Sequence, residues 1–243
     1  MSQQITTITF FRYQGFFNKV WAFQMMQFAH GSLATTEGLI FYKLMGSGKG
    51  LGFNPLPDWS IYSLLQVWEN ETAANAFFED SALIKKYQAH TLEQWTIYLK
   101  NIGAHGLWSG GNPFEKSDNL DPENPKIAVI TRATIKVSQL ATFWKYVPTS
   151  EQPLKNNDGL IYTKGIGEIP IIQMATFSLW KDLAAVKKFA YESKAHRTAI
   201  DKTRQLNWYK EELFARFQPY KYLGKWRGVN EELRINNSLD VDQ

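Results

Sequence analysis

The sequence predicts an α+β protein in which one strand-helix-strand-strand-helix-strand unit occurs twice. Three observations lead to this expectation: two parts of the chain match one another, both show the same order of β-forming and helix-forming stretches, and a polar stretch separates them. A unit with this element order is ferredoxin-like. By analogy with known folds, two such units lay their sheets together with the helices outside. We therefore expect duplicated ferredoxin-like units that form a dimeric-type α+β barrel within one chain.

An internal duplication is the strongest of these observations. Gly38–Lys43 (GLIFYK) resembles Gly159–Lys164 (GLIYTK), and Trp68 opens a stretch that matches the one beginning at Trp180. Matching landmarks in the same order indicate a repeat. The further landmarks are Ile8-Thr9 with Ile130-Thr131, Trp21 with Trp144, and the closing Gly-x-Trp-x-Gly motifs Gly106–Gly110 and Gly224–Gly228. We interpret the recurring tryptophans, Trp68 with Trp180 and Trp108 with Trp226, as parts of the scaffold.

The elements of the first copy follow from its residue patterns. Ile5–Phe11 alternates as a strand does, and residues 16–29 have the length of a helix. Gly38–Leu44 and Ser60–Trp68 are rich in β-forming residues and predict two further strands. The Ala-rich residues 71–98 predict one long helix, followed by a short strand before Gly106.

The second copy repeats this order, and the two copies set the expected domain boundaries. Its elements are Lys126–Thr134, Ser138–Tyr146, Gly159–Lys164, Ile171–Trp180, Leu183–Trp208 and Leu213–Tyr222. Residues 113–125 are polar and Pro-rich, which is typical of a linker. We therefore expect a first repeat at 1–112, a linker at 113–125, a second repeat at 126–230 and a polar tail at 231–243.

Composition excludes several classes of site. The 243 residues include no Cys, so disulfides, Cys-ligated zinc or iron–sulfur centres, thiolate-ligated haem and a cysteine nucleophile are all excluded. The four His residues lack the spacing of a two-His zinc helix. No stretch is long and apolar enough to span a membrane, and no secretory signal is visible. These features predict a cytoplasmic protein that could still contact a membrane face.

Two segments have an unusual composition. Residues 193–227 hold nine basic and three acidic residues, which fits either a solvated helix face or a site for carboxylates, phosphates or an acidic redox partner. No nucleic-acid recognition signature accompanies this charge, so no nucleic-acid partner is expected. Gly46–Pro57 is Gly-rich but lacks the phosphate-loop order. It is interpreted as a surface loop or as a loop that covers a pocket.

His196 is the histidine best placed to act as a ligand. It follows Ser193, a candidate helix N-cap, and its helical neighbours Ala199, Ile200 and Thr203 are small or apolar. The matching position in the first copy is Ile84, so one copy has an imidazole where the other has an aliphatic side chain. A histidine with an ordinary structural function is the alternative. From these residues alone, a non-thiolate haem and a cofactor-free apolar pocket both fit.

Several motifs resemble the spheroidene monooxygenase family of acyclic-carotenoid ketolases. The motifs are Phe11–Phe16 (FRYQGF), Val20–Phe23 (VWAF), Phe41–Pro55 with its spaced glycines, and Trp208–Phe217 (WYKEELFARF). The resemblance covers roughly residues 5–112 and 159–228. The Gly-rich segment and the WYKEELFARF stretch are its most specific parts.

The resemblance implies a haem b (iron) oxygenase that adds oxygen at an end carbon of a linear carotenoid, giving a hydroxyl and then a ketone. It implies a reduced ferredoxin-type electron donor and His196 as the axial metal ligand. Arg197 and Arg204 are candidates for the haem propionates by charge. Lys43, Ser47 and Phe53 are expected to line or cover the distal side as the catalytic set. Contact with a membrane surface and assembly into a homo-oligomer are left open.

Two other hypotheses keep the fold and change the function. One is a haem-containing dehydratase or peroxidase-like enzyme on the same barrel. The other is a non-catalytic protein that binds haem or an apolar ligand. Product analysis with a linear carotenoid, oxygen and a reductant separates these alternatives from the monooxygenase.

Overall fold

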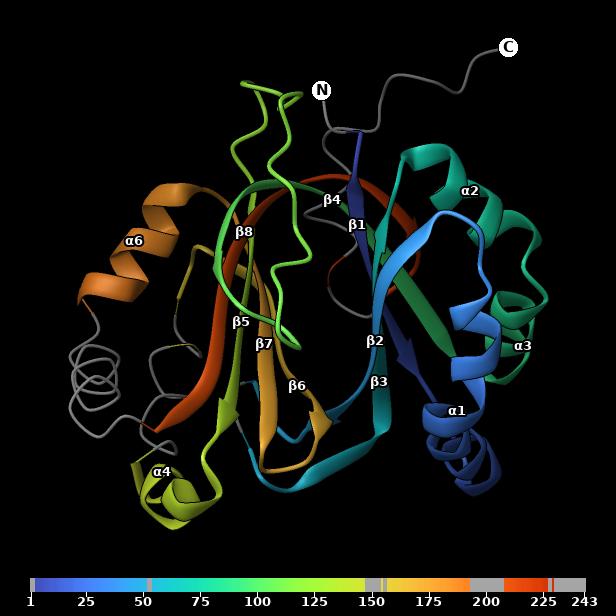
Figure 1. The fold of residues 1–243 in the computed structure, drawn as a ribbon, viewed down its shortest axis with the longest axis horizontal. Coiled ribbons are helices and arrows are strands. Elements are labelled where there is room, and N and C mark those ends of the chain that lie inside the picture. Colours follow the sequence, from blue (N-terminus) through green and yellow to red (C-terminus); the bar gives the residue numbers. More distant parts are fainter. Residues whose placement is uncertain are drawn as a thin grey trace.

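The structure, a computed structural model, describes residues 3–51, 54–146, 154, 157–192, 208–226 and 229. Its eight named strands close into an antiparallel barrel in the order β1-β3-β2-β6-β7-β5-β8-β4 (Figure 1). The strands are β1 (Ile5–Arg12), β2 (Leu39–Gly48), β3 (Pro57–Trp68), β4 (Glu93–Gly106), β5 (Ile127–Ile135), β6 (Leu160–Ile169), β7 (Gln173–Trp180) and β8 (Tyr209–Gly224). The expected α+β barrel is confirmed.

The helices lie outside the barrel, on two opposite sides of it (Figure 1). On one side α1 (Phe16–Ala34), α2 (Glu71–Asp80) and α3 (Ala82–His90) cover the strands of the first repeat. On the other side the short helix η1 (Val137–Gln139) leads into α4 (Leu140–Tyr146), and α6 (Leu183–Glu192) follows β7. This is the arrangement expected from two units whose sheets join and whose helices stay outside.

The two repeats agree in strand register as well as in element order. Ile5 pairs with Trp68 between β1 and β3, and Ile127 pairs with Trp180 between β5 and β7. Both hairpins also have an irregularity at the same place, after Leu39 in β2 and after Leu160 in β6. Helices α2 and α6 begin and end at positions 112 residues apart. The duplication is therefore a structural one, position by position.

The prediction of one long helix over 71–98 is wrong. The helix ends at Asp80, and Ser81 adopts an extended backbone and accepts a hydrogen bond from the Leu83 backbone N–H at 3.2 Å, which starts α3. A Ser at this position favours a cap over a continued helix. The segment from Glu93 onward is β4, a strand of 14 residues rather than a short one. Its aromatic and β-branched residues, including Trp95 and Ile97, favour a strand.

The barrel interior is filled by aromatic and aliphatic side chains. The rings of Phe10 and Phe177 lie 5.4 Å apart, and those of Trp95 and Trp226 lie 6.2 Å apart. The recurring tryptophans Trp68, Trp108, Trp180 and Trp226 are all buried. Because these side chains occupy the middle of the barrel, a ligand site has to lie at a barrel end or on its outer surface.

The connection between the repeats, residues 113–125, contains no helix or strand but is anchored to the barrel. Phe114 is buried and its ring lies 5.0 Å from that of Phe217. The Gln218 side chain accepts a hydrogen bond from the Asp121 N–H and donates one to the Asp121 carbonyl, both at 2.7 Å. The connection thus contributes one core side chain and is fastened to β8.

Candidate active site

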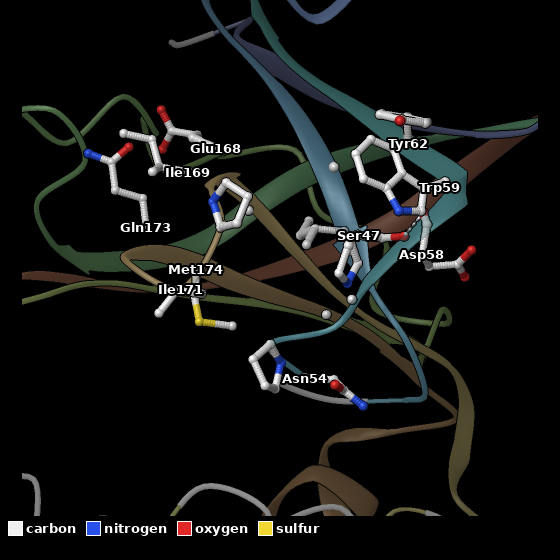
Figure 2. Close-up of a pocket in the computed structure, with 18 of the residues that line it drawn as sticks. Ser47, Asn54, Asp58, Trp59, Tyr62, Glu168, Ile169, Ile171, Gln173 and Met174 are labelled. Atoms are coloured by element: carbon white, nitrogen blue, oxygen red, sulfur yellow. Dashed lines mark hydrogen bonds between the residues drawn. The ribbon is translucent and has the colours of Figure 1, made fainter. Parts of the chain in front are cut away.

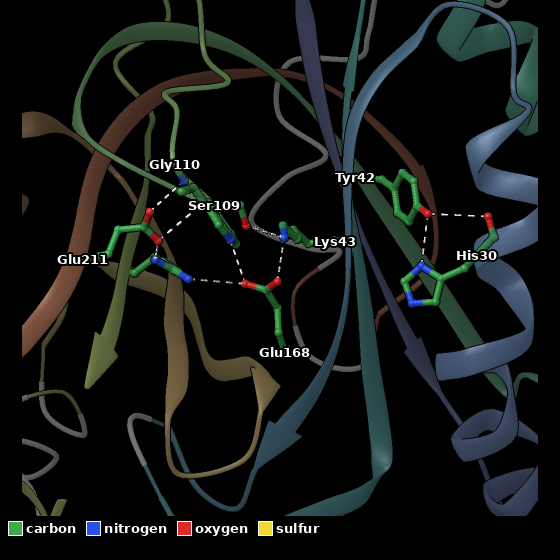
Figure 3. Close-up of polar contacts among 9 residues, drawn as sticks. His30, Tyr42, Lys43, Ser109, Gly110, Glu168 and Glu211 are labelled. Atoms are coloured by element: carbon green, nitrogen blue, oxygen red, sulfur yellow. Dashed lines mark hydrogen bonds and ion pairs between the residues drawn. The ribbon is translucent and has the colours of Figure 1, made fainter. Parts of the chain in front are cut away.

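Four charged side chains gather inside the barrel, one each from β2, β5, β6 and β8 (Figure 3). We call Lys43, Arg132, Glu168 and Glu211 the interior charge cluster. Lys43 Nζ lies 2.7 Å from a Glu168 carboxylate oxygen, and Arg132 bridges Glu168, at 3.9 Å, and Glu211. The Arg132 side chain is only 2% exposed. Two cations and two anions balance one another there, as burial of charge requires.

The residues after β4 complete this cluster. Trp108 Nε1 donates to a Glu168 oxygen at 2.7 Å, and the backbone N–H groups of Ser109 and Gly110 donate to Glu211 at 3.1 and 2.8 Å. Lys43 Nζ also donates to the Ser109 hydroxyl at 2.8 Å (Figure 3). The Gly-x-Trp-x-Gly motif of the first repeat therefore binds charged side chains that come largely from the second repeat.

The environment of Glu211 lowers the pKa of its carboxyl group. Burial alone would raise that pKa, but the N–H groups of Gly110 and Ser109 and the charge of Arg132 outweigh it. Glu211 is thus held as a carboxylate at neutral pH.

A pocket of about 200 Å³ lies where the two repeats meet along β2 and β6 (Figure 2). The strands pair at Gly46 and Gly167, and Gly48 and Gly165 also line the wall, so four positions there carry no side chain. Helix α1 contributes Phe23 and Met26. The other walls are largely apolar and include Trp59, Tyr62, Ile166, Ile169, Pro170, Ile171 and Met174.

Two polar side chains of the pocket wall, Ser47 and Asp58, are already engaged. The Ser47 hydroxyl donates to the Ile61 carbonyl at 2.8 Å, and Asp58 forms a 3.0 Å ion pair with Lys164. Burial alone would raise the pKa of Asp58, but hydrogen bonds from Ser60 and Lys164 and the Lys164 charge together lower it. The pocket therefore offers an apolar lining with compensated charges, which suits an apolar ligand.

The structure places two of the six predicted site residues. Ser47 lines the pocket. Lys43 does not line it, but its ion-pair partner Glu168 belongs to both the interior charge cluster and the pocket wall. Phe53 lies outside the described residues, although Asn54 next to it lines the pocket. The candidate ligand His196 and the candidates Arg197 and Arg204 also lie outside the described residues.

The other histidines have ordinary surroundings. The His90 ring stacks on Trp21 at 4.1 Å and contacts Asn18, so this residue is partly covered. His30 contacts the Tyr42 hydroxyl at 3.0 Å (Figure 3), and His105 lies next to the last residue of β4. Within the described part of the chain, no group of three or more His, Asp or Glu residues is placed to hold a metal ion.

The outer faces of the two repeats differ at positions that match in register. In the first repeat this face is covered by large buried side chains, whereas the second repeat has smaller or polar ones there. The matched pairs are Phe11 with Ala133, Leu44 with Gly165, Leu64 with Thr176, and Tyr98 with Arg216. Thr176 forms a 2.5 Å hydrogen bond with Thr131, in the middle of the second face.

The same correspondence gives His196 a buried counterpart. The offset of 112 residues that relates α2 to α6 pairs His196 with Ile84. Ile84 is fully buried in the cluster that covers the outer face of the first repeat. The pocket adjoins the second face, because Gly165 and Met174 belong to both.

Sequence reasoning missed most of the interior charge cluster. Arg132, Glu168 and Glu211 are not among the site residues predicted from the sequence, and no local feature separates Glu211 from the exposed Glu212 beside it. The available signal was Arg132 itself, a charged residue within the otherwise uncharged strand segment Ile127–Ile135. Its partners come from other strands, so their proximity required the barrel.

Solved structures with a similar fold define the architectural class. A crystal structure of aldoxime dehydratase in complex with butyraldoxime has a TM-score of 0.60 at 11% identity, over 91% of this chain and 82% of that one. A second aldoxime dehydratase structure gives 0.61 at 11% identity, over 91% and 85%. The protein therefore has the α+β barrel fold of these enzymes. No family model matches the chain.

Curated relatives identify the family. The chain is 34% identical to a spheroidene monooxygenase of Cereibacter sphaeroides over 93% of its length and 69% of the relative's. It is 33% identical to the one from Rhodobacter capsulatus, over 92% and 93%, and 32% identical to that of Rubrivivax gelatinosus, over 79% and 73%. The chain belongs to the spheroidene monooxygenase family, as its motifs predicted, and is an oxidoreductase of the monooxygenase type. In the part that the structure describes, no helix is long and apolar enough to cross a membrane.

Proposed function

We propose that this protein is a haem-dependent monooxygenase that oxidises an end carbon of a linear, spheroidene-like carotenoid, first to a hydroxyl and then to a ketone. Membership of the family supports the reaction class, and the relatives' names support the substrate. A reduced ferredoxin-type protein would supply the electrons. The observation that carries the haem proposal is the contrast between the two outer faces.

The second outer face fits a flat apolar group better than the first. Three large side chains of the first repeat are replaced by Ala133, Gly165 and Thr176, which leaves less side-chain bulk on the sheet. His196 would hold the haem iron, and support for this comes from its counterpart Ile84, which is buried against the equivalent face. Arg197 and Arg204 would bind the propionates by charge. Haem, when bound, supplies the oxygen activation that side chains cannot.

The pocket between the repeats is the proposed place for the end of the carotenoid. A long polyene needs apolar walls, and Trp59, Ile169 and Met174 provide them. Ser47 keeps its hydroxyl on the Ile61 carbonyl, so it shapes the wall without adding a free donor. Lys43 neutralises Glu168, which lets that carboxylate border an apolar pocket. Phe53 would cover the ligand from the adjoining connection.

The first experiment tests the cofactor and its ligand. Purified protein should show a Soret band, and His196→Ala should lose it, whereas His30→Ala and His90→Ala should retain it because both contact residues of the first repeat. Thr176→Leu, which restores the side chain of the first repeat, should lower haem occupancy while leaving the circular dichroism spectrum unchanged. A normal ferric spectrum in His196→Ala would refute the ligand assignment.

The second experiment tests the reaction. Detergent-dispersed spheroidene is incubated with the haem-loaded protein, oxygen and a reduced ferredoxin. The products are separated by chromatography and their masses are measured by mass spectrometry. Products carrying one added oxygen atom, with the oxygen derived from labelled O₂, are expected. Retention of the carotenoid without oxidation would instead favour a non-catalytic binding protein, and loss of water from a substrate would favour a dehydratase.

A further inference from the structure

Helix α1 has an exposed surface without charged side chains. Among residues 16–34 the only Asp, Glu, Lys or Arg is Lys19, and it is half-buried. Phe16, Phe17 and Phe28 are 73%, 85% and 70% exposed. By contrast, α2 and α3 expose charged residues such as Glu79 and Lys86. We call the exposed apolar side chains Phe16, Phe17, Val20, Phe23 and Phe28 the α1 face.

Two hairpin tips extend the α1 face towards the pocket. Leu56 and Trp59 come from the β2–β3 hairpin, and Ile169 and Ile171 come from the β6–β7 hairpin; all four are between 41% and 59% exposed. The Phe23 and Trp59 rings lie 5.4 Å apart. Phe23, Trp59, Ile169 and Ile171 also line the pocket. In Figure 1, α1 and both hairpin ends lie along the lower edge of the molecule.

The tip of the β6–β7 hairpin holds an isoleucine in a strained conformation. Ile171 has a φ of 74°, in the left-handed region that β-branched residues avoid. It follows Pro170 in a turn closed by a 3.3 Å hydrogen bond from the Ile172 N–H to the Ile169 carbonyl. Glycine is the usual residue at such a position. An Ile costs stability there and its side chain is 41% exposed, which fits a function outside folding.

The charges around this surface favour an anionic partner. In α1 and in the connection 49–56, the only charged residues are Lys19 and Lys49, both cationic. The acidic residues at the pocket, Asp58 and Glu168, are bound to Lys164 and Lys43. An uncharged, aromatic-rich surface with cations and compensated acids matches the boundary between lipid headgroups and acyl chains.

We propose that the α1 face and the two hairpin tips insert into the surface of an anionic phospholipid bilayer, so that the pocket opens directly into lipid. This inference rests on the proposed function, because a carotenoid is dissolved in the membrane and needs an apolar path to the pocket. The occupant is lipid rather than a second copy of the chain. Exposed aromatic side chains around a pocket mouth are otherwise unfavourable in water.

Vesicle binding tests the surface. The purified protein is sedimented with vesicles of phosphatidylcholine and phosphatidylglycerol, and with vesicles of phosphatidylcholine alone. The double variant Phe16→Gln/Phe17→Gln should lower the partition coefficient about tenfold or more, because two exposed rings lose their apolar contact. The matched control Ile40→Gln/Leu107→Gln removes two exposed apolar residues outside this surface and should bind as the wild type does.

Brominated lipids give a second readout at the hairpin tip. Quenching of tryptophan fluorescence should be weaker in Trp59→Phe than in the wild type, because Trp59 lies at the proposed surface. Equal quenching in the two proteins would overturn the proposal. So would equal vesicle binding by the wild type and the Phe16→Gln/Phe17→Gln variant, or a wild-type dimer that this variant converts to a monomer.

Ile171→Gly separates binding from stability. Glycine relieves the backbone strain, so the urea midpoint should rise, while vesicle binding should fall because an apolar side chain is lost. A variant that is more stable and binds less cannot be explained by misfolding. If Ile171→Gly and the wild type bind vesicles equally, the hairpin tip has no part in docking.

Activity assays distinguish this inference from the proposed function. The Phe16→Gln/Phe17→Gln variant should lose turnover of a carotenoid embedded in vesicles and keep turnover of the same carotenoid in detergent. Vesicle binding without any oxidation would support the docking surface and refute the proposed function. Oxidation in detergent by a protein that does not bind vesicles would support the proposed function and refute the docking surface.

Discussion

Glu168 is the residue that joins the interior of the barrel to the pocket. Its carboxylate binds Lys43 and the Trp108 indole, both at 2.7 Å, while the same side chain forms part of the pocket wall. Removing its charge would leave Lys43 and the buried Arg132 with Glu211 as the remaining anion of the interior charge cluster. The geometry of the cluster therefore depends strongly on this one residue.

Glu168→Gln should lower the free energy of unfolding by about 2 kcal/mol, because two cations lose a partner in a partly buried site. Urea unfolding followed by tryptophan fluorescence measures the change. Glu71→Gln is the control: Glu71 pairs with Lys221 at 3.4 Å, and both side chains are more than a third exposed. A pair of that kind contributes about 1 kcal/mol or less. Equal losses in the two variants would contradict a special contribution from Glu168.

Glu211 should make stability depend on acid pH. Its folded pKa is lowered below the ordinary value of 4.5, so its contribution is complete above that pH and is lost as the pH falls through the folded pKa. The difference in unfolding free energy between the wild type and Glu211→Gln should therefore be largest at neutral pH and shrink in acid. The control is Glu212→Gln, the exposed neighbour, which should change the unfolding free energy by less than about 0.5 kcal/mol at neutral pH. A constant difference for Glu211→Gln across pH would argue against a charged interaction.

At the scale of elements, Ser81 decides that two helices form where one was expected. It ends α2 and caps α3 through the Leu83 N–H. Ser81→Ala should lower the free energy of unfolding by about 1 kcal/mol, the usual cost of losing such a cap. Urea unfolding again provides the measurement. Ser32→Ala, at an exposed position within α1, should change stability by less than about 0.5 kcal/mol.

The sequence pattern was sufficient for the fold and insufficient for the site. Repeats and alternating strands predicted the barrel, because local periodicity reports which face of each element is buried. Residues 71–98 do not form the one long helix that their Ala-rich composition predicted. The cap at Ser81 and the strand pattern around Trp95 decide the structure there instead. The interior charge cluster could not be predicted, because Lys43 and Glu211 are 168 residues apart in sequence and meet only when the barrel closes.

At the scale of the whole molecule, the two repeats differ in the side chains that cover their outer faces. The first fills its outer face with large side chains, among them Leu64 and Tyr98. The second carries Thr176 and Arg216 at the matching positions, and we propose that it hosts the cofactor. The pocket lies between them.

The repeats are joined unequally along their two shared edges. Strands β4 and β8 pair from Trp95 to Gly106, whereas among the described residues β2 and β6 pair only at Gly46–Ser47 with Ile166–Gly167. The Asp58–Lys164 ion pair also links the two repeats near this short edge. We expect the short edge, where the pocket lies, to open locally without unfolding of the barrel, which would admit a bulky ligand.

Hydrogen exchange followed by mass spectrometry tests this expectation. Peptides covering 43–48 and 164–168 should exchange faster than peptides covering 97–104 and 213–218, because a short ladder opens at a lower free energy. Asp58→Asn leaves the Lys164 ammonium without its carboxylate, so it should accelerate exchange at the short edge by about tenfold, while the β4–β8 peptides stay unchanged. If all four peptides exchange together in both proteins, the barrel opens only as a whole, and ligand entry along the β2–β6 edge is ruled out.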